Sequence, residues 1–350
     1  MGLSWTQCWK EEFKEELSLT KLHLSLSRPE LLLQPQWGIA PWVWSLYRVF
    51  MLLYTLIWCM YSGLLFSNPK WLIFFSHLTY CLIVVYHLVA SCNLACAMVL
   101  VRCHCRDHRK TCSGGDQTRE RGNRAEPLGP FPLPSLLSIS LRLQWFLQSL
   151  MCAFCLTVSF LYWSLDYPME HHPLSPFNLN MHVGNSGQAL LDLLLSATPI
   201  HLAHYLYQLL IGCLYILFAV VYWLAGYTNL SGKPYIYKVL DFGGCPLLAA
   251  LCVLGFALVC LPICHFLVWN VQLLRRQLAG RVRGERLGLC REAWRWRVGG
   301  GGSPVPVSLM DPSSSVFTPR RRGEARGDGA TQTLLSSTTS TLYSAVTVYL

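Results

Sequence analysis

The sequence has few charged residues: they make up 13% of its 350 residues, about half the roughly 25% that is usual in soluble domains. Hydrophobic residues reach 53%. This composition excludes an ordinary water-soluble enzyme and is typical of a chain that crosses a membrane several times. Acidic residues are scarce too, 18 against 28 Lys and Arg. Because the basic residues flank apolar runs and do not alternate with aromatic residues, we expect no nucleic-acid partner.

A cleavable signal peptide is also missing, since a charged run from Lys10 to Glu16 occupies the place of an apolar core. The first membrane helix is therefore expected to act as its own insertion signal. The 16 cysteines form no disulfide framework, because most lie inside apolar stretches and are interpreted as small buried hydrophobic residues.

One cluster of cysteines and histidines, at residues 103–112, has the residue types of a zinc site. It lacks the paired two-Cys spacing of zinc knuckles. Reduced thiols, or palmitoylation of Cys103 and Cys105 beside basic residues, are the favoured interpretations. We expect no metal and no cofactor.

Four apolar runs are long enough to cross a bilayer, which takes about 20 apolar residues in a helix. They cover residues 41–66, 71–93, 145–165 and 245–269. A fifth stretch, residues 182–227, is too long for a single crossing and contains polar residues and a proline.

The distribution of Lys and Arg decides how that fifth stretch is divided, because these residues favour the cytoplasmic side of span ends. The tail after residue 271 carries twelve Arg, and the segments before the first span and after the second are also basic. Two crossings, at 182–200 and 205–226 with a tight turn near Pro199 and His201, keep all of these on one side. The sequence therefore predicts an all-α polytopic membrane protein: a six-helix transmembrane bundle with both termini cytoplasmic, in either the plasma membrane or the endoplasmic reticulum.

Outside the spans, composition divides the chain further. Residues 1–40 form a cytoplasmic N-terminal segment, and the Gly- and Pro-rich residues 102–133 form a flexible cytoplasmic loop within the domain 41–271. Residues 272–298 form a basic juxtamembrane segment, either a helix lying on anionic headgroups or a solvated flank. Residues 299–350 are predicted to be a disordered tail, whose final Val-Tyr-Leu could add as a strand to a PDZ domain. We therefore expect protein partners through the tail and membrane lipids around the bundle.

Three further modification sites follow from short motifs. The first six residues fit the myristoylation pattern with Gly2 as the acceptor, and Cys8 could carry a second acyl chain. Asn229 begins an Asn-Leu-Ser sequon on the side of the membrane opposite the termini. Its position close to the fifth span can prevent glycosylation.

Two predicted spans each carry a stripe of polar residues that, together with Ile83 in one span and Ala189 in the other, are spaced by three or four positions and therefore lie on one helix face. The stripes consist of Ser76, Tyr80, His87 and Ser91 in the second span and of His182, Asn185 and Asp192 in the fourth. Ionisable groups inside a membrane are costly, so these positions are the first candidates for function.

Ser76 and His182 lie at similar depth near the non-cytoplasmic ends of their spans. A hydroxyl and an imidazole are the minimum parts of a nucleophilic hydrolase. Asp192 lies about 15 Å from His182 along a regular helix, too far to complete a triad. Asp192 is interpreted as a buried polar partner for another helix, such as His87, with Asn185 as further buried support. The alternative for the whole set is helix packing through hydrogen bonds.

Several short motifs resemble the rolling stone family of multi-pass membrane proteins over about residues 8–270. They include Cys8-Trp9, Gln36-Trp37, Tyr47-Arg48, Lys70-Trp71, Tyr162-Trp163, Tyr167-Pro168, His182 with Asn185, Leu190 to Leu193, Pro199 with His204, and Tyr235 to Asp241. The resemblance implies a role in cell fusion or differentiation.

The family is also distantly similar to the androgen-induced membrane proteins, hydrolases of branched fatty-acid esters that use an intramembrane Thr and a His. The resemblance aligns Ser76 with the Thr and His182 with the His. Ser in place of Thr keeps the hydroxyl but departs from the pattern, and the nearby Thr79 offers an alternative register.

Three functional hypotheses result. The first is a non-catalytic membrane protein of cell fusion or differentiation, whose polar stripes hold helices together. The second is a serine-type hydrolase of lipid esters that uses Ser76 and His182. The third, a transporter or channel, ranks last because the sequence has no internal repeat and no ring of charge.

Overall fold

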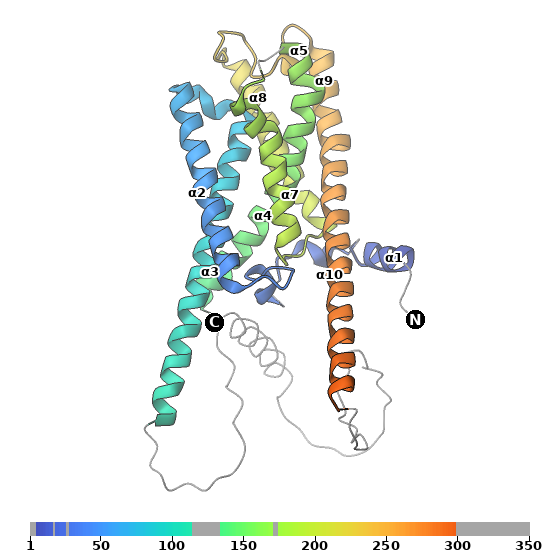
Figure 1. Cartoon of the computed structure of the whole chain (residues 1–350). Coiled ribbons are helices and arrows are strands. Elements are labelled where there is room, and N and C mark those ends of the chain that lie inside the picture. Colours follow the sequence, from blue (N-terminus) through green and yellow to red (C-terminus); the bar gives the residue numbers. More distant parts are fainter. Residues whose placement is uncertain (1–4, 17, 26–27, 114–133, 171–173, 299–350) are drawn as a thin grey trace, which may run out of the picture.

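A computed structural model describes residues 5–16, 18–25, 28–113, 134–170 and 174–298 (Figure 1). Within these ranges the regular structure is helical, apart from one isolated bridge between Pro35 and Ser196. The predicted all-α class is confirmed. The α-helices are α1 (Trp5–Glu16), α2 (Pro41–Phe66), α3 (Phe75–Ser113), α4 (Ser135–Leu161), α5 (Tyr167–Glu170), α6 (Pro176–Leu179), α7 (Asn185–Leu195), α8 (Tyr205–Leu224), α9 (Pro246–Gly255) and α10 (Leu261–Val298).

Short helical segments of tighter or wider pitch join these helices. The 3-10 segments are η1 (Leu19–Leu22), η2 (Pro29–Leu32), η3 (Pro69–Ile73), η6 (Leu202–His204) and η7 (Lys238–Leu240). The π-helical segments are η4 (Tyr162–Asp166), η5 (Asn180–Gly184) and η8 (Phe256–Cys260). Each π segment continues directly into an α-helix, so α4 to α5, α6 to α7 and α9 to α10 each form an unbroken helical stretch.

Five helical stretches of the described chain are long and apolar enough to cross a membrane, and the protein is therefore a multi-pass membrane protein. They are Pro41–Phe66, Phe75–Cys103, Ser135–Glu170, Leu202–Leu224 and Pro246–Val282. These stretches overlap all the predicted spans except the fourth. The second begins at Phe75 and not at residue 71, because Pro69–Ile73 forms the separate segment η3.

The segment predicted as the fourth span differs from the prediction in its boundaries. The helical stretch runs from Pro176 to Leu195 and contacts α4, whereas residues 196–201 are extended. In that extended part Ala197 donates a backbone hydrogen bond to Gln34 at 3.1 Å. The helix ends early because Pro199 has no N–H to donate and disfavours helical geometry in the residue before it.

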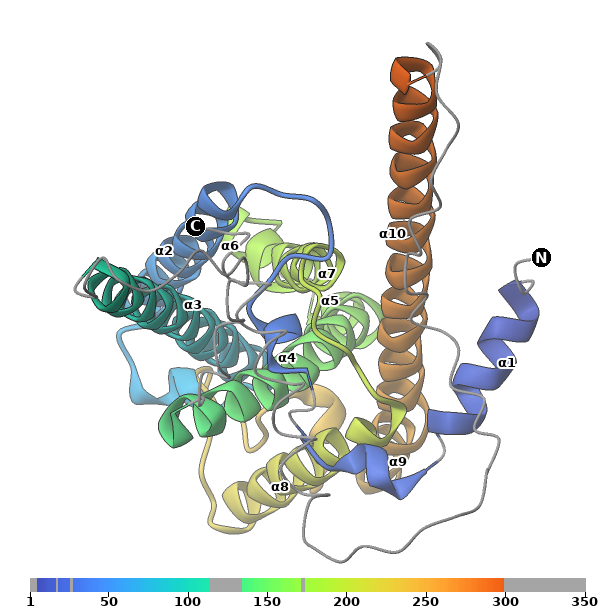
Figure 2. The ribbon, with the colours of Figure 1, turned by 90° about the horizontal axis from the view of Figure 1, so that it is seen from below.

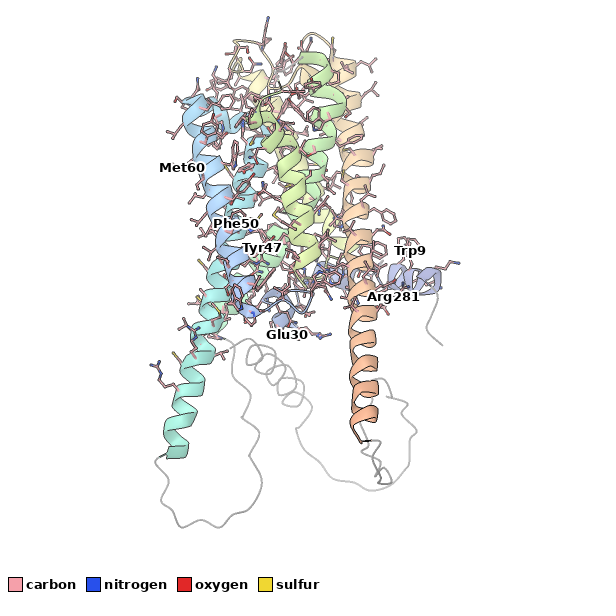
Figure 3. The ribbon with its side chains drawn as sticks, in the orientation of Figure 1. Trp9, Glu30, Tyr47, Phe50, Met60 and Arg281 are labelled. Carbon is pink, nitrogen blue, oxygen red and sulfur yellow. The ribbon has the colours of Figure 1, made fainter. Side chains whose placement is uncertain are left out.

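Helix α4 forms the centre of the bundle, as Figure 2 shows in the view along the bundle. It contacts α3, α7, α8 and α10. Its side chains Met151, Phe154 and Cys155 are at most 2% exposed. By contrast, α2 lies at the periphery and exposes large apolar side chains such as Phe50 and Met60, labelled in Figure 3.

Two helices continue far beyond the apolar runs that the sequence delimits. Residues 102–113, expected to begin a flexible loop, extend α3, and residues 272–298, the predicted basic segment, extend α10. Both extensions project from the lower end of the bundle in Figure 1. Extending an existing helix costs little, and Arg, Lys and Leu favour helix. The basic segment therefore continues α10 along its axis.

Helix α1 lies crosswise at the lower end of the bundle and packs against α10 (Figures 1 and 2). Trp9 donates from its indole to Asn270 at 3.0 Å, and its ring lies edge-on against Trp269. The carboxylate of Glu16 accepts hydrogen bonds from His201 at 2.8 Å and from the backbone of Leu202 at 2.9 Å. The N-terminal segment is thus attached to the bundle at both ends of its first helix.

Candidate functional site

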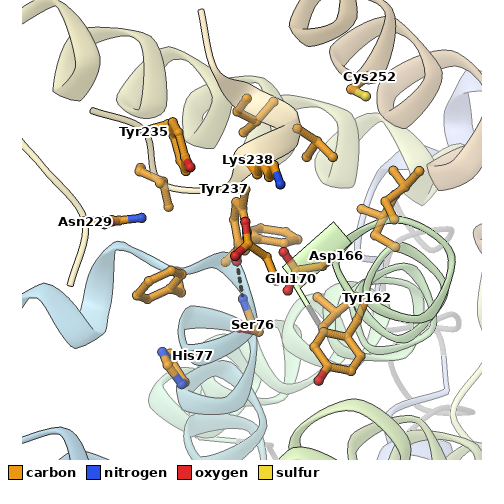
Figure 4. A pocket seen from close by; sticks show the side chains of 18 of the residues that line it. Ser76, His77, Tyr162, Asp166, Glu170, Asn229, Tyr235, Tyr237, Lys238 and Cys252 are labelled. Atoms are coloured by element: carbon orange, nitrogen blue, oxygen red, sulfur yellow. Dashed lines mark hydrogen bonds between the residues drawn. The ribbon is translucent and has the colours of Figure 1, made fainter. Parts of the chain in front are cut away.

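A cavity of about 670 Å³ lies at the end of the bundle opposite α1. Residues of α2, α3, α4 to α5, α6 to η5, α8, α9 and the segment 225–245 line it, and Figure 4 shows it from close by. Its apolar walls include Phe66, Phe74, Phe75, Val158, Leu161, Phe177, Ile216 and Phe256. Its polar lining includes Ser76, His77, Asp166, Glu170, His182, Lys233, Tyr237 and Lys238. The volume and the mainly apolar lining suit one small amphiphilic molecule.

Ser76 is the second residue of α3 and faces this cavity. The chain before it is fixed by two hydrogen bonds. The side-chain oxygen of Asn68 caps η3 by accepting from the backbone of Lys70 at 2.9 Å, and the Tyr215 hydroxyl donates to the carbonyl of Ile73 at 2.9 Å. The start of α3 is therefore held in place by both the preceding turn and α8.

Tyr237 approaches Ser76 from the segment 225–245. Its hydroxyl accepts the backbone N–H of Ser76 at 3.5 Å, shown as the dashed line in Figure 4. Its ring lies edge-on against Phe74 at 5.6 Å. Burial raises the pKa of Tyr237 to about 12, although hydrogen bonds with Ser76 act in the opposite direction. The phenol is therefore neutral at pH 7 and keeps a proton to donate.

His182 belongs to the π-helical segment η5 and lines the same cavity. Its ring stacks on Tyr162, with the ring centroids 3.5 Å apart and the planes 2° from parallel. The indole of Trp163 donates to the His182 carbonyl at 3.2 Å. These contacts fix both the ring and the backbone of His182.

The structure thus brings Ser76 and His182 to one cavity, without a direct hydrogen bond between them. Both are described residues, and the hydrogen bond of Ser76 runs to Tyr237. Their assignment as a catalytic pair stays a prediction.

Charged side chains of both signs lie among the polar residues of the cavity. Asp166 and Glu170 come from η4 and α5, whereas Lys233 and Lys238 come from the segment 225–245. Lys238 donates to the carbonyl of Met169 at 3.5 Å. The cavity therefore combines an apolar interior with a zwitterionic set of charges.

The segment 225–245 is anchored beside the cavity and contains the sequon residue Asn229. Lys70 donates from its ammonium group to the Thr228 hydroxyl at 3.0 Å. The side-chain oxygen of Asn229 accepts from the backbone of Ser231 and of Lys233, each at 2.9 Å. Asn229 lines the cavity itself. Its glycosylation stays a prediction.

Asp192 lies in a separate buried network nearer the other end of the bundle. Its carboxylate contacts the Arg48 guanidinium at 2.8 Å and accepts from the Tyr86 hydroxyl at 2.5 Å. Gln148 donates to it at 2.9 Å and Tyr47 at 3.1 Å. Helices α2, α3, α4 and α7 therefore meet at one ion pair, and the interpretation of Asp192 as a buried interhelical partner agrees with this arrangement.

The suggested partner of Asp192 was nevertheless wrong. His87 is fully buried, and neither of its ring nitrogens has a hydrogen-bond partner within the described chain. The amide of Asn185 is likewise buried without a partner there. Arg48 takes the place expected for His87 because a permanently charged, forked guanidinium compensates a buried carboxylate better than a neutral imidazole does. Arg48, seven positions after the start of α2, is 2% exposed inside the bundle.

Sequence reasoning about the site missed Tyr237, Tyr162 and Arg48. All three lie in the motifs that carry the family resemblance, which is the available signal for them. Among the candidate lipidation sites, Cys103 is exposed on α3. Gly2, the side chains of Cys8 and Cys105, and the C-terminal tail lie outside what the structure describes.

A family model and a known protein both match a large part of the chain. A family model described as "Protein rolling stone" matches residues 5–282. The chain is 24% identical to Protein rolling stone of Drosophila melanogaster over 243 residues, which cover 66% of this chain and 79% of that relative. No solved structure matches the chain. Since the matched range includes every residue that lines the cavity, the conclusion applies to the site as well as to the spans: the chain belongs to the rolling stone family.

Proposed function

We propose that the protein crosses the membrane six times, with both termini in the cytoplasm and the cavity at the opposite face. The five apolar stretches are supplemented by the helical stretch 176–195, which is more polar and packs against α4. All Lys and Arg except Lys70, Lys233, Lys238 and the buried Arg48 then lie on the cytoplasmic side or near its edge. The polar face of the stretch 176–195 can lie within the membrane because Asp192 is paired with Arg48 inside the bundle.

Protease protection of tagged chains tests this topology. In sealed microsomes, a tag at the carboxyl terminus should be cleaved and a tag inserted after Gly232 should be protected. Each tag is the control for the other. A carboxyl-terminal tag that is protected while the tag after Gly232 is cleaved would overturn the six-span arrangement.

We further propose that the protein hydrolyses a lipid ester in the cavity, with Ser76 as nucleophile and His182 as base. The observation that carries this proposal is that both residues line one cavity with apolar walls. An acyl chain can lie among the Phe side chains while the ester carbonyl reaches Ser76. The distant resemblance to membrane hydrolases of fatty-acid esters, which aligns these two residues with the Thr and the His, supports the same assignment.

The proposed reaction has two steps. The Ser76 hydroxyl attacks the ester carbonyl carbon while His182 takes its proton, and the C=O electron pair moves onto the carbonyl oxygen. Collapse of this intermediate breaks the ester C–O bond, and the departing alkoxide takes the proton from His182. Water then attacks the acyl-Ser76 ester by the same route and releases the fatty acid. Closing the distance between Ser76 and His182 on substrate binding is part of this proposal, since catalytic hydrogen bonds often tighten only in the complex.

A fluorophosphonate probe tests the assignment in membranes. The wild-type chain should be labelled, and Ser76→Ala and His182→Ala should abolish labelling. Ser91→Ala, on the same helix but outside the cavity, should be labelled like the wild type. Loss of labelling in Thr79→Ala with labelling retained in Ser76→Ala would move the nucleophile to Thr79. A folded wild-type protein that is never labelled would refute the hydrolase proposal.

The second candidate is a non-catalytic role in cell fusion or differentiation. Membership of the rolling stone family supports it, as does the geometry in which the backbone of Ser76 bonds to Tyr237 and His182 stacks on Tyr162. In this case the cavity would bind a membrane lipid without cleaving it. A cell-mixing assay with Ser76→Ala separates the two candidates, because full fusion activity in this variant favours the non-catalytic role.

A further inference from the structure

The backbone N–H of Ser76 has no acceptor within its own helix. Ser76 lies in the first turn of α3, where backbone N–H groups have no carbonyl four residues earlier in the helix. Its N–H points to the Tyr237 hydroxyl at 3.5 Å, at the long limit for a hydrogen bond. Two donors, one N–H and one phenol O–H, therefore stand side by side at the proposed nucleophile (Figure 4).

Attack by Ser76 on an ester creates negative charge on the former carbonyl oxygen. A hydrolase lowers this barrier with fixed hydrogen-bond donors near the nucleophile, and the backbone N–H of the nucleophile itself commonly supplies one. A second donor is needed from another part of the chain. Among the residues that line the cavity, Tyr237 is the one that bonds to the backbone of Ser76.

We propose that Tyr237 is a further catalytic residue, whose phenol O–H acts together with the Ser76 N–H to stabilise the oxyanion of the tetrahedral intermediate. This inference rests on the proposed hydrolase function and adds a specific role to it. No proton is transferred from Tyr237: it donates a hydrogen bond that strengthens as charge develops on the oxygen and weakens again when the intermediate collapses.

Three features of the structure suit Tyr237 to this role. Its ring is held against Phe74 and its segment is tied to Lys70 through Thr228, so the hydroxyl is held in position before substrate binds. Its pKa of about 12 keeps the proton on the phenol at neutral pH. The positive end of the α3 dipole lies at the same point and favours negative charge there.

Substitution of Tyr237 by Phe tests the proposal in full-length protein in lipid nanodiscs, with a single-chain fluorogenic fatty-acid ester as the probe. Removing one oxyanion donor lowers kcat by roughly 100- to 1,000-fold in other hydrolases, and we expect a similar loss here with KM nearly unchanged. Tyr227→Phe is the matched control, because Tyr227 is exposed and does not line the cavity. It should keep the wild-type rate.

A second variant separates catalysis from folding. Replacement of Tyr237 by a difluorotyrosine preserves the ring and the hydroxyl but lowers the phenol pKa. The phenolate cannot donate, so the high-pH limb of kcat should move to lower pH, an effect that a purely structural role would not produce. Asp166 and Tyr215 are the titratable groups that interact with the phenol, and His182 lines the same cavity; all three stay unchanged in this variant.

The outcomes are distinguishable. The hydrolase function stands if the wild type hydrolyses the ester and Ser76→Ala abolishes this activity. The role of Tyr237 is then refuted if Tyr237→Phe keeps kcat within about threefold of the wild type, since the loss of an oxyanion donor should lower kcat far more. If Tyr237→Phe fails to fold, an unshifted pH profile of the difluorotyrosine variant refutes the role. If the wild type and Ser76→Ala both lack activity, the proposed hydrolase function itself has failed.

Discussion

At the scale of single residues, the pair of Arg48 and Asp192 places two opposite charges inside the bundle. Moving two charges out of water is unfavourable, and their attraction compensates only when geometry and hydrogen bonding are good. Asp192 meets this condition, since Tyr47, Tyr86 and Gln148 occupy its remaining acceptor sites. The network therefore fixes which helices lie together.

Removing one partner of this pair should be strongly destabilising. We expect Asp192→Asn to lower the free energy of unfolding by about 3–5 kcal/mol, because the Arg48 charge stays buried without compensation. Thermal unfolding of the detergent-solubilised protein measures this loss. The double variant Arg48→Met with Asp192→Leu is the control and should recover much of it; a double variant less stable than Asp192→Asn would contradict the explanation.

What the sequence could predict at this scale depended on the kind of residue. Ser76 and His182 can be found from the sequence because each is polar in a largely apolar helix. The predicted topology, in which both spans begin on the non-cytoplasmic side, places them at similar depth. Arg48 lies only seven positions after Pro41, the start of α2, and nothing in the sequence shows that it is buried. Only the structure shows that α7 lies beside α2 and brings the Asp192 carboxylate into contact with Arg48.

At the scale of elements, the attachment of α1 depends on the ionisation of one carboxylate. Burial would raise the pKa of Glu16, but its hydrogen bond and charge interaction with His201 and the N–H of Leu202 bring it below the ordinary value. A carboxylate with a lowered pKa stabilises the folded state above its unfolded pKa and loses this contribution as the pH falls through the folded value.

Helix α1 should therefore be most firmly docked above pH of about 4.3, the unfolded pKa of Glu, and should loosen as the solution is acidified below that value. Hydrogen exchange of a peptide covering residues 5–16 measures the change. Glu16→Gln should raise exchange already at neutral pH. Exchange that is unaffected by both the acidification and the substitution would show that the aromatic contacts of Trp9 alone hold the helix.

The approach of α8 to η8 depends on a glycine. A Cβ atom on Gly212 would lie 2.9 Å from the ring of Phe256, a cavity residue, which is closer than real contacts allow. We expect Gly212→Leu to lower the free energy of unfolding by about 1–3 kcal/mol, as overpacked cores usually do, and to reduce probe labelling at Ser76. Thermal unfolding and labelling measure the two effects. Gly63→Leu is the control, since nothing lies within 4 Å of a Cβ there; equal behaviour of both variants would contradict the packing argument.

Helix boundaries were the part of the elements that composition could not supply. The start and end of α2 were predicted correctly, because Pro41 starts the run and a polar turn follows Phe66. In α3 and α10 the helix continues beyond its apolar residues. Composition shows where the apolar residues end and therefore predicts the end of each helix too early. The segment 176–195 begins before its apolar part, and its start at Pro176 is fixed by the Ser175 side chain, which accepts from the backbone of Asn178.

At the scale of the whole molecule, the bundle is organised around one central helix. Side chains of α4 fill the core, whereas α2 presents much of its surface to lipid. Hydrophobicity could not distinguish the two, because lipid-facing and buried positions in a membrane protein are both apolar. Ranking helices by burial therefore required the structure.

This difference predicts that the same substitution lowers the free energy of unfolding much more in α4 than in α2. Phe154→Ala in α4 removes a side chain that is 2% exposed and should lower the free energy of unfolding by about 3–5 kcal/mol. Phe50→Ala in α2, where Phe50 is 59% exposed, should change it little. Thermal unfolding in detergent compares the two. Equal losses would show that α4 is no more central than α2.

Helix α3 begins at the cavity and ends at Ser113, 39 residues later, without a break. At 1.5 Å per residue it is a rod of roughly 58 Å, longer than the bilayer is thick. Because the helix is so long, a small tilt of its first turn, caused by a molecule bound beside Ser76, would move its far end by a larger distance. We therefore expect occupancy of the cavity to change the position of basic residues such as Arg102 and Arg106, which lie near the other end of α3.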